Sequence, residues 1–226
     1  MKVLVIQQRP GIGDLVIFLA FIKKIASKFN SPVSLLVKAN SKAGEILKND
    51  KDIDQIIYLD RNANKKGSHD GLGFFRLVGE IRKHRFDKVF IFNSSLRYYL
   101  LAKFAGIKEI HQYPLGRKKD NVINSAKELT EKVLGKKIST QPIINVDQNQ
   151  VDIAKAQYNI STEHKNIVLG ISASGEDKRW FIDGFISTCE KLNKLKPCKF
   201  YLAAGKNDKH LIDKVINSPI GKNCIS

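Results

Sequence analysis

The start of the chain carries the stretch that decides the fold. Lys2-Val-Leu-Val-Ile6 is a short apolar run, Gln7-Gln-Arg-Pro-Gly11 follows it, and an apolar segment extends from about Asp14 to Lys28. The first run predicts a strand, and the glycines at 11 and 13 predict a tight turn that a ligand can approach closely. The segment after the turn is hydrophobic on nearly every side, so we expect a buried helix. Strand, glycine turn and buried helix form the opening of a βαβ unit.

The same alternation continues along the chain. Further strands are predicted at 32–37, 55–59, 88–92 and 109–112, and helices at 41–48, 72–83, 94–104 and 121–134. A second series has strands at 166–171, 199–204 and 223–225 and helices at 181–195 and 208–216. Apolar strands that alternate with helices predict a mostly parallel sheet covered on both faces.

These elements predict an α/β protein with two Rossmann-type domains. We expect a parallel-sheet N-terminal domain over residues 1–145, a crossover with a polar helix over 146–165, and a partial second domain over 166–226. The second series ends inside a predicted strand, and two or three short strands make a poor sheet. We therefore expect the second domain to be incomplete within these 226 residues.

The charge of the chain is strongly positive. Lys and Arg number 39 against 22 Asp and Glu, and only 8 of the 39 are Arg. This excess predicts attraction to nucleic acid, to an anionic membrane face or to phosphorylated substrates, with a solvated basic surface as the alternative. The lysines are spread along the chain and no zinc-finger spacing accompanies them, so a nucleic-acid binder rests on charge alone and no specific nucleic-acid partner is expected.

The cysteine pattern and the apolar runs bear on localisation. The three cysteines form no Cys-x-x-Cys pair, which favours a reducing compartment. The longest apolar run, Leu15 to Ile22, is far shorter than the ~20 residues of a membrane span, and no signal-peptide cleavage pattern follows it. We expect a cytoplasmic protein.

The first candidate site is the turn Pro10-Gly-Ile-Gly-Asp14. In open α/β sheets, ligands bind outside the carboxyl ends of the strands, and Asp14 follows the first predicted strand. Its carboxylate has the chemistry of a general base for an acceptor hydroxyl. The structural alternative is an N-cap or first-turn aspartate. Val16 stands where a third glycine would complete a Gly-x-Gly-x-x-Gly motif, so no dinucleotide fingerprint is present.

The second candidate site lies between a strand and a helix of the second series. Ser172, Ser174 and Lys178 offer two hydroxyls and a point cation close to a helix start, which suits a diphosphate. The alternative is an ordinary polar loop in which Trp180 packs.

A third group of candidates consists of cations in loops of the first series. Arg61, Arg97 and Arg117 follow predicted strands, so they are placed to border the same crevice, although a solvated surface explains any single one. No His-Glu-x-x-His, Gly-x-Ser-x-Gly or paired Cys/His pattern occurs, so a metal site and serine hydrolysis are unsupported.

In their order and spacing, these segments resemble the ADP-heptose:lipopolysaccharide heptosyltransferase family (glycosyltransferase family nine, GT-B fold). The family opens with a strand that runs into a Gly-Asp turn, as at Gly13-Asp14. Phe86-Asp-Lys-Val-Phe-Ile-Phe-Asn-Ser-Ser-Leu-Arg97 is similar to its Tyr-Asp-Leu-Val-Ile-Asp-Leu-His-Gly-Ser-Leu-Arg-Ser stretch. A small hydroxyl loop that ends in Lys-x-Trp is matched by Ser172-Ala-Ser-Gly-Glu-Asp-Lys-Arg-Trp180. The family's later Asp-[Ser/Thr]-Gly-Pro-x-His motif, which helps bind the donor, is not found.

The resemblance implies a bacterial enzyme of lipopolysaccharide biosynthesis. It would move a heptose-like sugar from an ADP-sugar donor to a lipopolysaccharide-core or related acceptor, with inversion and without a metal or other cofactor. Asp14 corresponds to the general base, and Ser172, Ser174 and Lys178 correspond to the donor-diphosphate loop.

The resemblance also assigns a role to the basic N-terminal domain. Gly13, Arg61, Arg97 and Arg117 are expected to contact an anionic, lipid-linked acceptor at the inner membrane surface. The alternative that the incomplete second domain leaves open is a non-catalytic or remnant nucleotide-binding module.

Overall fold

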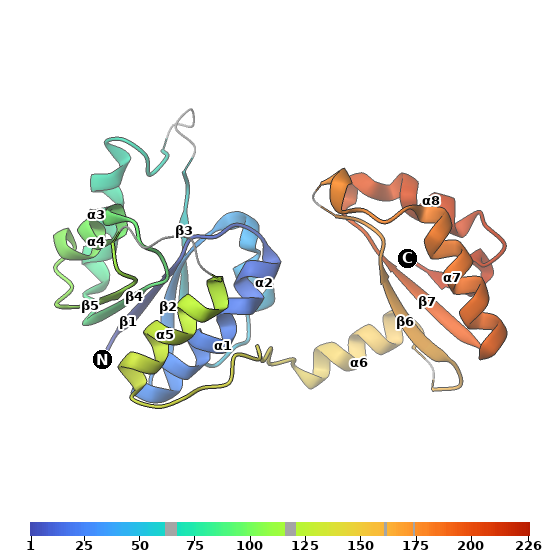
Figure 1. The fold of residues 1–226 in the computed structure, drawn as a ribbon, viewed down its shortest axis with the longest axis horizontal. Coiled ribbons are helices and arrows are strands. Elements are labelled where there is room, and N and C mark those ends of the chain that lie inside the picture. The colour runs from blue at the N-terminus through green and yellow to red at the C-terminus, as the bar shows by residue number, and fades with distance from the viewer. Residues whose placement is uncertain (62–66, 116–120, 161, 174) are drawn as a thin grey trace. The chain divides into compact units, whose positions relative to one another are not determined.

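The computed structural model describes residues 1–226 except 62–66, 116–120, 161 and 174, and Figure 1 shows its course. The chain divides into two compact units, Met1–Asn145 and Val146–Ser226. Each unit is an α/β structure with its own parallel sheet, which confirms the predicted fold class.

The first unit is built on a five-stranded parallel sheet in the order β3-β2-β1-β4-β5. Its strands are β1 (Val3–Gln7), β2 (Val33–Lys38), β3 (Ile53–Leu59), β4 (Lys88–Ile91) and β5 (Glu109–Gln112). Val3 of the central strand β1 pairs with Val33 on one side and with Lys88 on the other. Because all the pairs are parallel, the carboxyl ends of the five strands meet at one edge of the sheet.

Helices cover both faces of this sheet, as Figure 1 shows. They are α1 (Ile12–Phe29), α2 (Ala43–Ile46), α3 (Gly73–His84), α4 (Leu96–Phe104) and α5 (Val122–Leu134). Val3 and Val5 pack in one core with residues of α1 and α5, whereas Leu4 and Ile6 pack in the other with residues of α3 and α4. Burial on both faces explains why β1 is a continuous apolar run.

Local sequence explains where α1 begins and ends. Gly11 is its N-cap with φ 95°, a conformation that favours glycine. Asn30, in the left-handed region, ends the helix, and its N–H donates to the carbonyls of Ala26 and Ser27. The buried side chains that hold α1 in the core include Phe18, the fourth residue after Asp14.

The helix predicted at 41–48 is wrong in extent. The structure has a 3₁₀ turn at Ala39–Ser41 and then the single-turn helix α2. Lys42, between them, has φ 57°, a left-handed conformation that interrupts any continuous right-handed helix. The other helices and strands form close to their predicted positions.

The second unit has a three-stranded parallel sheet in the order β6-β7-β8. Its elements are α6 (Gln148–Gln157), β6 (Lys165–Gly170), α7 (Ile182–Leu195), β7 (Cys198–Ala203), α8 (Lys209–Ile216) and β8 (Cys224–Ile225). A small core joins α7 and α8 to one face of the sheet through Ile182, Phe200 and Val215. The loops after β6 and β7 lie together at the carboxyl edge of this sheet, since the Gly205 N–H donates to the Ser172 hydroxyl oxygen.

Candidate functional site

The turn between β1 and α1 places Asp14 in the first turn of the helix. Gly11 caps the helix, and Asp14 makes no side-chain capping bond there, so the first-turn alternative describes its position and the N-cap alternative does not. Arg9 Nε donates to Asp14 Oδ1 at 2.7 Å, and about a quarter of the Asp14 side chain is exposed (24%). This leaves a carboxylate that is fixed at one oxygen and accessible to solvent.

Gly13 has a property that the fold alone does not require. Apart from its chain neighbours and its own helix backbone, no atom of the described residues lies within 4 Å of a Cβ built on Gly13, and its φ is not in the left-handed region. A glycine in a helix costs about 1 kcal/mol relative to alanine, so neither sterics nor backbone conformation accounts for it. The open space at Gly13 is what close approach of a ligand to the backbone needs.

A buried glutamine ends β1, and a half-buried one ends β5. The side chain of Gln7 is completely buried (0% exposed), and its Oε1 and Nε2 have no hydrogen-bond partner in the part of the chain that the structure describes. Gln112 Nε2 donates to the carbonyls of Asn93 and Ser95, both at 2.9 Å. Sequence reasoning missed both glutamines, although for Gln7 a polar residue that closes an apolar strand was a usable signal. Buried polar atoms without a hydrogen-bond partner, such as those of Gln7, can be explained by a bound ligand or water that supplies the missing hydrogen bonds.

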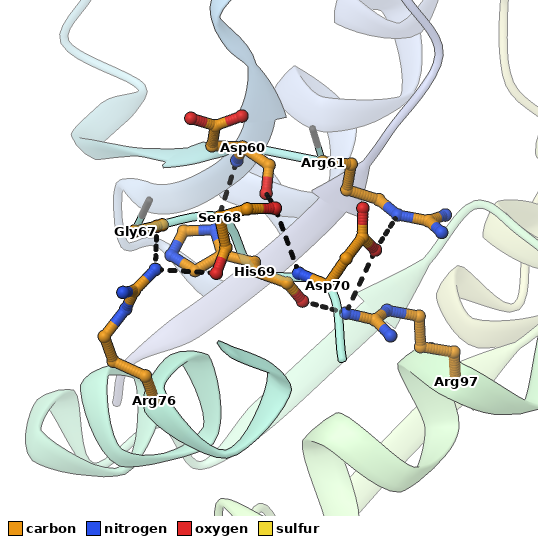
Figure 2. Close-up of polar contacts among 8 residues, drawn as sticks. All are labelled: Asp60, Arg61, Gly67, Ser68, His69, Asp70, Arg76 and Arg97. Carbon is orange, nitrogen blue, oxygen red and sulfur yellow. Dashed lines mark hydrogen bonds and ion pairs between the residues drawn. The ribbon is translucent and has the colours of Figure 1, made fainter. Parts of the chain in front are cut away.

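The loop between β3 and α3 is closed at its base by hydrogen bonds (Figure 2). The His69 N–H donates to the Asp60 carbonyl at 2.8 Å, and the Asp60 N–H donates to His69 Nδ1 at 3.1 Å. Arg76 of α3 donates to the carbonyls of Gly67 and Ser68. A Cβ on Gly73 would lie 1.9 Å from the Ser68 carbonyl oxygen, so the backbone of this loop passes where only glycine fits.

His69 is therefore a neutral, structural histidine. Burial lowers its pKa, and the weaker attraction of Glu80 opposes that shift. Its Nδ1 accepts the Asp60 N–H, which places the proton of the neutral ring on Nε2, the atom 3.9 Å from the Glu80 carboxylate.

Two of the predicted acceptor residues are brought together by this loop. Asp70 Oδ1 accepts from Arg61 Nε at 2.9 Å and lies 3.8 Å from the Arg97 guanidinium (Figure 2). Arg97 also donates to the His69 carbonyl, and its guanidinium stacks over the Phe74 ring at 4.9 Å. Arg117 lies outside the described residues. Sequence reasoning missed Asp70, since the path of a polar loop is not encoded in hydrophobic periodicity.

The electrostatics of this cluster are dominated by the two guanidinium groups. The hydrogen bond to Asp70 raises the pKa of Arg61, so the group stays charged. Burial raises the pKa of Tyr98, and Arg61 and Arg97 oppose the shift from nearby. One carboxylate thus faces two arginines, and the cluster keeps a net positive charge.

In the second unit, the loop after β6 is braced by side chains that sequence reasoning missed. Arg179 donates to the Ala173 carbonyl at 3.2 Å and pairs with Asp208 at 2.8 Å. Asp208 is nearly buried. Arg179 is one of only eight arginines in a lysine-rich chain, and this rarity could have marked it as a candidate for a specific ion pair.

The predicted donor residues of this loop fall into three situations. The Ser172 oxygen accepts the Gly205 N–H at 3.0 Å, so its own hydroxyl proton remains available as a donor. Lys178 ends the 3₁₀ turn Glu176–Lys178, is exposed, and makes no ion pair with any residue that the structure describes. Ser174 lies outside the described residues.

Trp180 is half exposed and contacts neighbouring aromatic rings. Its ring makes edge contacts with Phe181 and Phe185 at 5.2 and 4.9 Å. A Cβ on Gly184 would come within 2.7 Å of the Trp180 and Phe181 rings, so only a glycine lets the two rings pack against α7 at this position. Among the described residues, no group of three or more His, Cys, Asp or Glu is placed to hold a metal ion.

Comparison with known proteins gives a fold and no close sequence relative. No protein-family model matches the chain, and no curated protein does either. Among solved structures, ADP-heptose LPS heptosyltransferase II of E. coli superposes with a TM-score of 0.69 at 16% identity, over 99% of this chain and 71% of that one.

Two further solved structures agree. A family 9 glycosyltransferase of Veillonella parvula has a TM-score of 0.71 at 16% identity, over 96% of this chain and 66% of that one. E. coli heptosyltransferase WaaC with ADP-2-deoxy-2-fluoro heptose has a TM-score of 0.66 at 12% identity, over 99% of this chain and 75% of that one. The predicted resemblance is thereby confirmed at the level of the fold, which is that of GT-B glycosyltransferases. This chain spans between 66% and 75% of their lengths.

Proposed function

We propose that this chain is an inverting glycosyltransferase that moves a heptose-like sugar from an ADP-sugar to a lipopolysaccharide-core or related glycan acceptor. The observation that carries the proposal is the Arg9–Asp14 pair in a glycine turn at the carboxyl edge of a GT-B-like N-terminal unit. The nucleotide is taken from the similar WaaC structures, which contain ADP-2-deoxy-2-fluoro heptose or ADP.

The chemistry assigned to Asp14 is general-base catalysis. The carboxylate removes the proton of the acceptor hydroxyl as that oxygen attacks the anomeric carbon. The bond between the anomeric carbon and the diphosphate oxygen breaks in the same displacement, so the configuration inverts and ADP leaves. Arg9 holds one carboxylate oxygen, which orients the other toward the acceptor.

The second unit is assigned to the donor. Lys178 and the Ser172 hydroxyl neutralise and hydrogen-bond the diphosphate as charge develops on it. Ser174, in the same loop, is proposed as a further donor residue. No protein cofactor takes part in this scheme, and the nucleotide sugar is the co-substrate.

The first unit is assigned to the acceptor. Residues 1–145 contain 27 Lys and Arg against 13 Asp and Glu, whereas residues 146–226 contain 12 against 9, so most of the charge excess lies in this unit. Gly13, Arg61 and Arg97, with Arg117, are proposed to receive an anionic, lipid-linked glycan at the cytoplasmic face of the inner membrane. None of the described helices is long and apolar enough to cross a membrane.

Substitution of Asp14 tests the reaction. Asp14→Asn keeps an oxygen that accepts from Arg9 but cannot take up the proton, so we expect transfer to fall by about 10²- to 10⁴-fold. ADP binding, measured by calorimetry, should be unchanged. Asp213→Asn, which alters an exposed aspartate of α8, is the matched control and should keep normal transfer.

Near-normal turnover of Asp14→Asn would exclude Asp14 as the base. The remnant-module alternative makes a different prediction for the unaltered chain: weak or absent ADP binding and no transfer with any nucleotide sugar. Steep salt dependence of binding to DNA or RNA, in place of sugar transfer, would favour the nucleic-acid alternative.

A further inference from the structure

An apolar patch is exposed on α3 and the end of α4. Leu72 at the start of α3 is 87% exposed and Phe75 is 62% exposed, and Phe104 is half exposed. Phe74 joins them, with ring centroids 5.6 Å from Phe75 and 6.4 Å from Phe104. We call Leu72, Phe74, Phe75 and Phe104 the α3–α4 patch. The half-buried Phe74 ring connects the exposed Phe75 and Phe104, and Leu72 lies two residues before Phe74. Contiguous exposed apolar surface marks an interaction site more often than scattered apolar residues do.

The residues around the patch are basic. Helices α3 and α4 together contain five Lys or Arg and one acidic residue, Glu80. Arg97 stacks on the Phe74 ring, and Arg82 donates to the Phe104 carbonyl at 2.7 Å. Apolar and aromatic side chains bordered by cations are the composition that binds the interface of an anionic bilayer.

We propose that the α3–α4 patch docks this protein on an anionic lipid bilayer. Leu72 and Phe75 enter the headgroup and upper acyl region, while the exposed cations Arg82, Lys83 and Lys103 contact lipid phosphates. The cations of α3 and α4 favour an anionic occupant, and a second copy docked through the same helices would set cations against cations. A bilayer with anionic headgroups over an apolar interior complements both the cations and the apolar side chains.

The patch lies beside the arginines assigned to the acceptor. Phe74 belongs to it and contacts Arg97, which Asp70 links to Arg61. A membrane bound at the patch would deliver the anionic head of a lipid-linked molecule next to these arginines. The proposed docking thus adds a membrane-binding surface to the proposed function. The role of the docking, which is to bring a lipid-linked acceptor to the arginines, rests on the proposed function, whereas the binding to the bilayer does not.

Vesicle binding without donor or acceptor tests the docking by itself. We expect the full chain to sediment with phosphatidylcholine vesicles that contain about one fifth phosphatidylglycerol, and much less with phosphatidylcholine alone. The double variant Leu72→Ser, Phe75→Ser should bind the anionic vesicles about tenfold more weakly. The matched control is Val168→Ser, Leu195→Ser, which removes two exposed apolar side chains of the second unit and should bind normally.

A direct contact measurement covers the case of a misfolded double variant. Phe75→Trp, in a Trp180→Phe background, should be quenched by brominated lipids, whereas Trp180 in the unaltered chain should not. Equal binding by the double variant, or no quenching at position 75, overturns the proposal. A concentration-dependent dimer that the double variant abolishes overturns it in favour of a second copy. Vesicle binding that depends on Leu72 and Phe75 in a chain without transferase activity would sink the proposed function and leave the docking standing.

Discussion

At the scale of single residues, Gly13 is a position where the fold does not need glycine but a bound ligand would. Beyond its chain neighbours and helix backbone, no atom of the described residues lies within 4 Å of a Cβ placed there, and alanine is the better helix former. We therefore expect Gly13→Ala to fold normally, with an unchanged or higher midpoint of urea unfolding. Its transfer rate at low acceptor concentration should fall at least about tenfold, because the methyl group occupies the space beside Asp14 that the acceptor needs.

The matched control for this change is Gly79→Ala. Gly79 lies in the middle of α3, and a Cβ there also meets nothing within 4 Å. This variant should gain stability in the same way and keep full activity. Unchanged acceptor kinetics in Gly13→Ala would contradict the assignment of Gly13 to the acceptor.

At the scale of elements, the loop from β3 to α3 contains a pH-sensitive contact. Burial lowers the pKa of His69 below its ordinary value of about 6.5. As pH falls below that value, the unfolded chain takes up a proton that the folded chain does not, so stability decreases toward the folded pKa and is fully present above about pH 6.5. Protonation of His69 Nδ1 would also remove the bond from the Asp60 N–H.

We expect the free energy of unfolding, from urea titrations, to fall as the pH is lowered below about 6.5. His69→Gln, which lacks a titrating ring, should show a smaller fall. Some pH dependence should persist, because burial also lowers the pKa of His111. His164→Gln changes an exposed histidine and should behave like the unaltered chain. An identical pH dependence in His69→Gln would show that His69 does not contribute.

Elements were more predictable than contacts. Apolar runs and glycines placed β1 and α1 within a residue or two, because buried faces impose a hydrophobic period on the sequence. The prediction of a helix at 41–48 was wrong in extent because nothing in the composition indicates the left-handed conformation of Lys42. The Arg9–Asp14 pair and the bridge from Asp70 to Arg61 depend on how polar loops turn, and polar residues carry no comparable period.

At the scale of the whole molecule, the predicted site is divided between two compact units. Asp14, Arg61 and Arg97 belong to Met1–Asn145, whereas Ser172 and Lys178 belong to Val146–Ser226. The assignment of acceptor to the first unit and donor to the second therefore predicts separable effects. Substitutions in different units that share no partner should change the free energy of transition-state binding additively, within about 0.5 kcal/mol.

Lys178→Ala and Arg61→Gln form the test pair. Lys178→Ala removes an exposed cation without an ion pair among the described residues, so it should raise the KM for the donor and leave the acceptor KM unchanged. Arg61→Gln should raise the acceptor KM alone, and Asp70 keeps Arg97 as a neighbour in that variant. With donor and acceptor both well below their KM values, the transfer rate of the double variant should show the product of the two losses. A rise in the acceptor KM of Lys178→Ala, or a double variant no worse than either single one, would contradict the division of labour, because one unit would then serve both substrates.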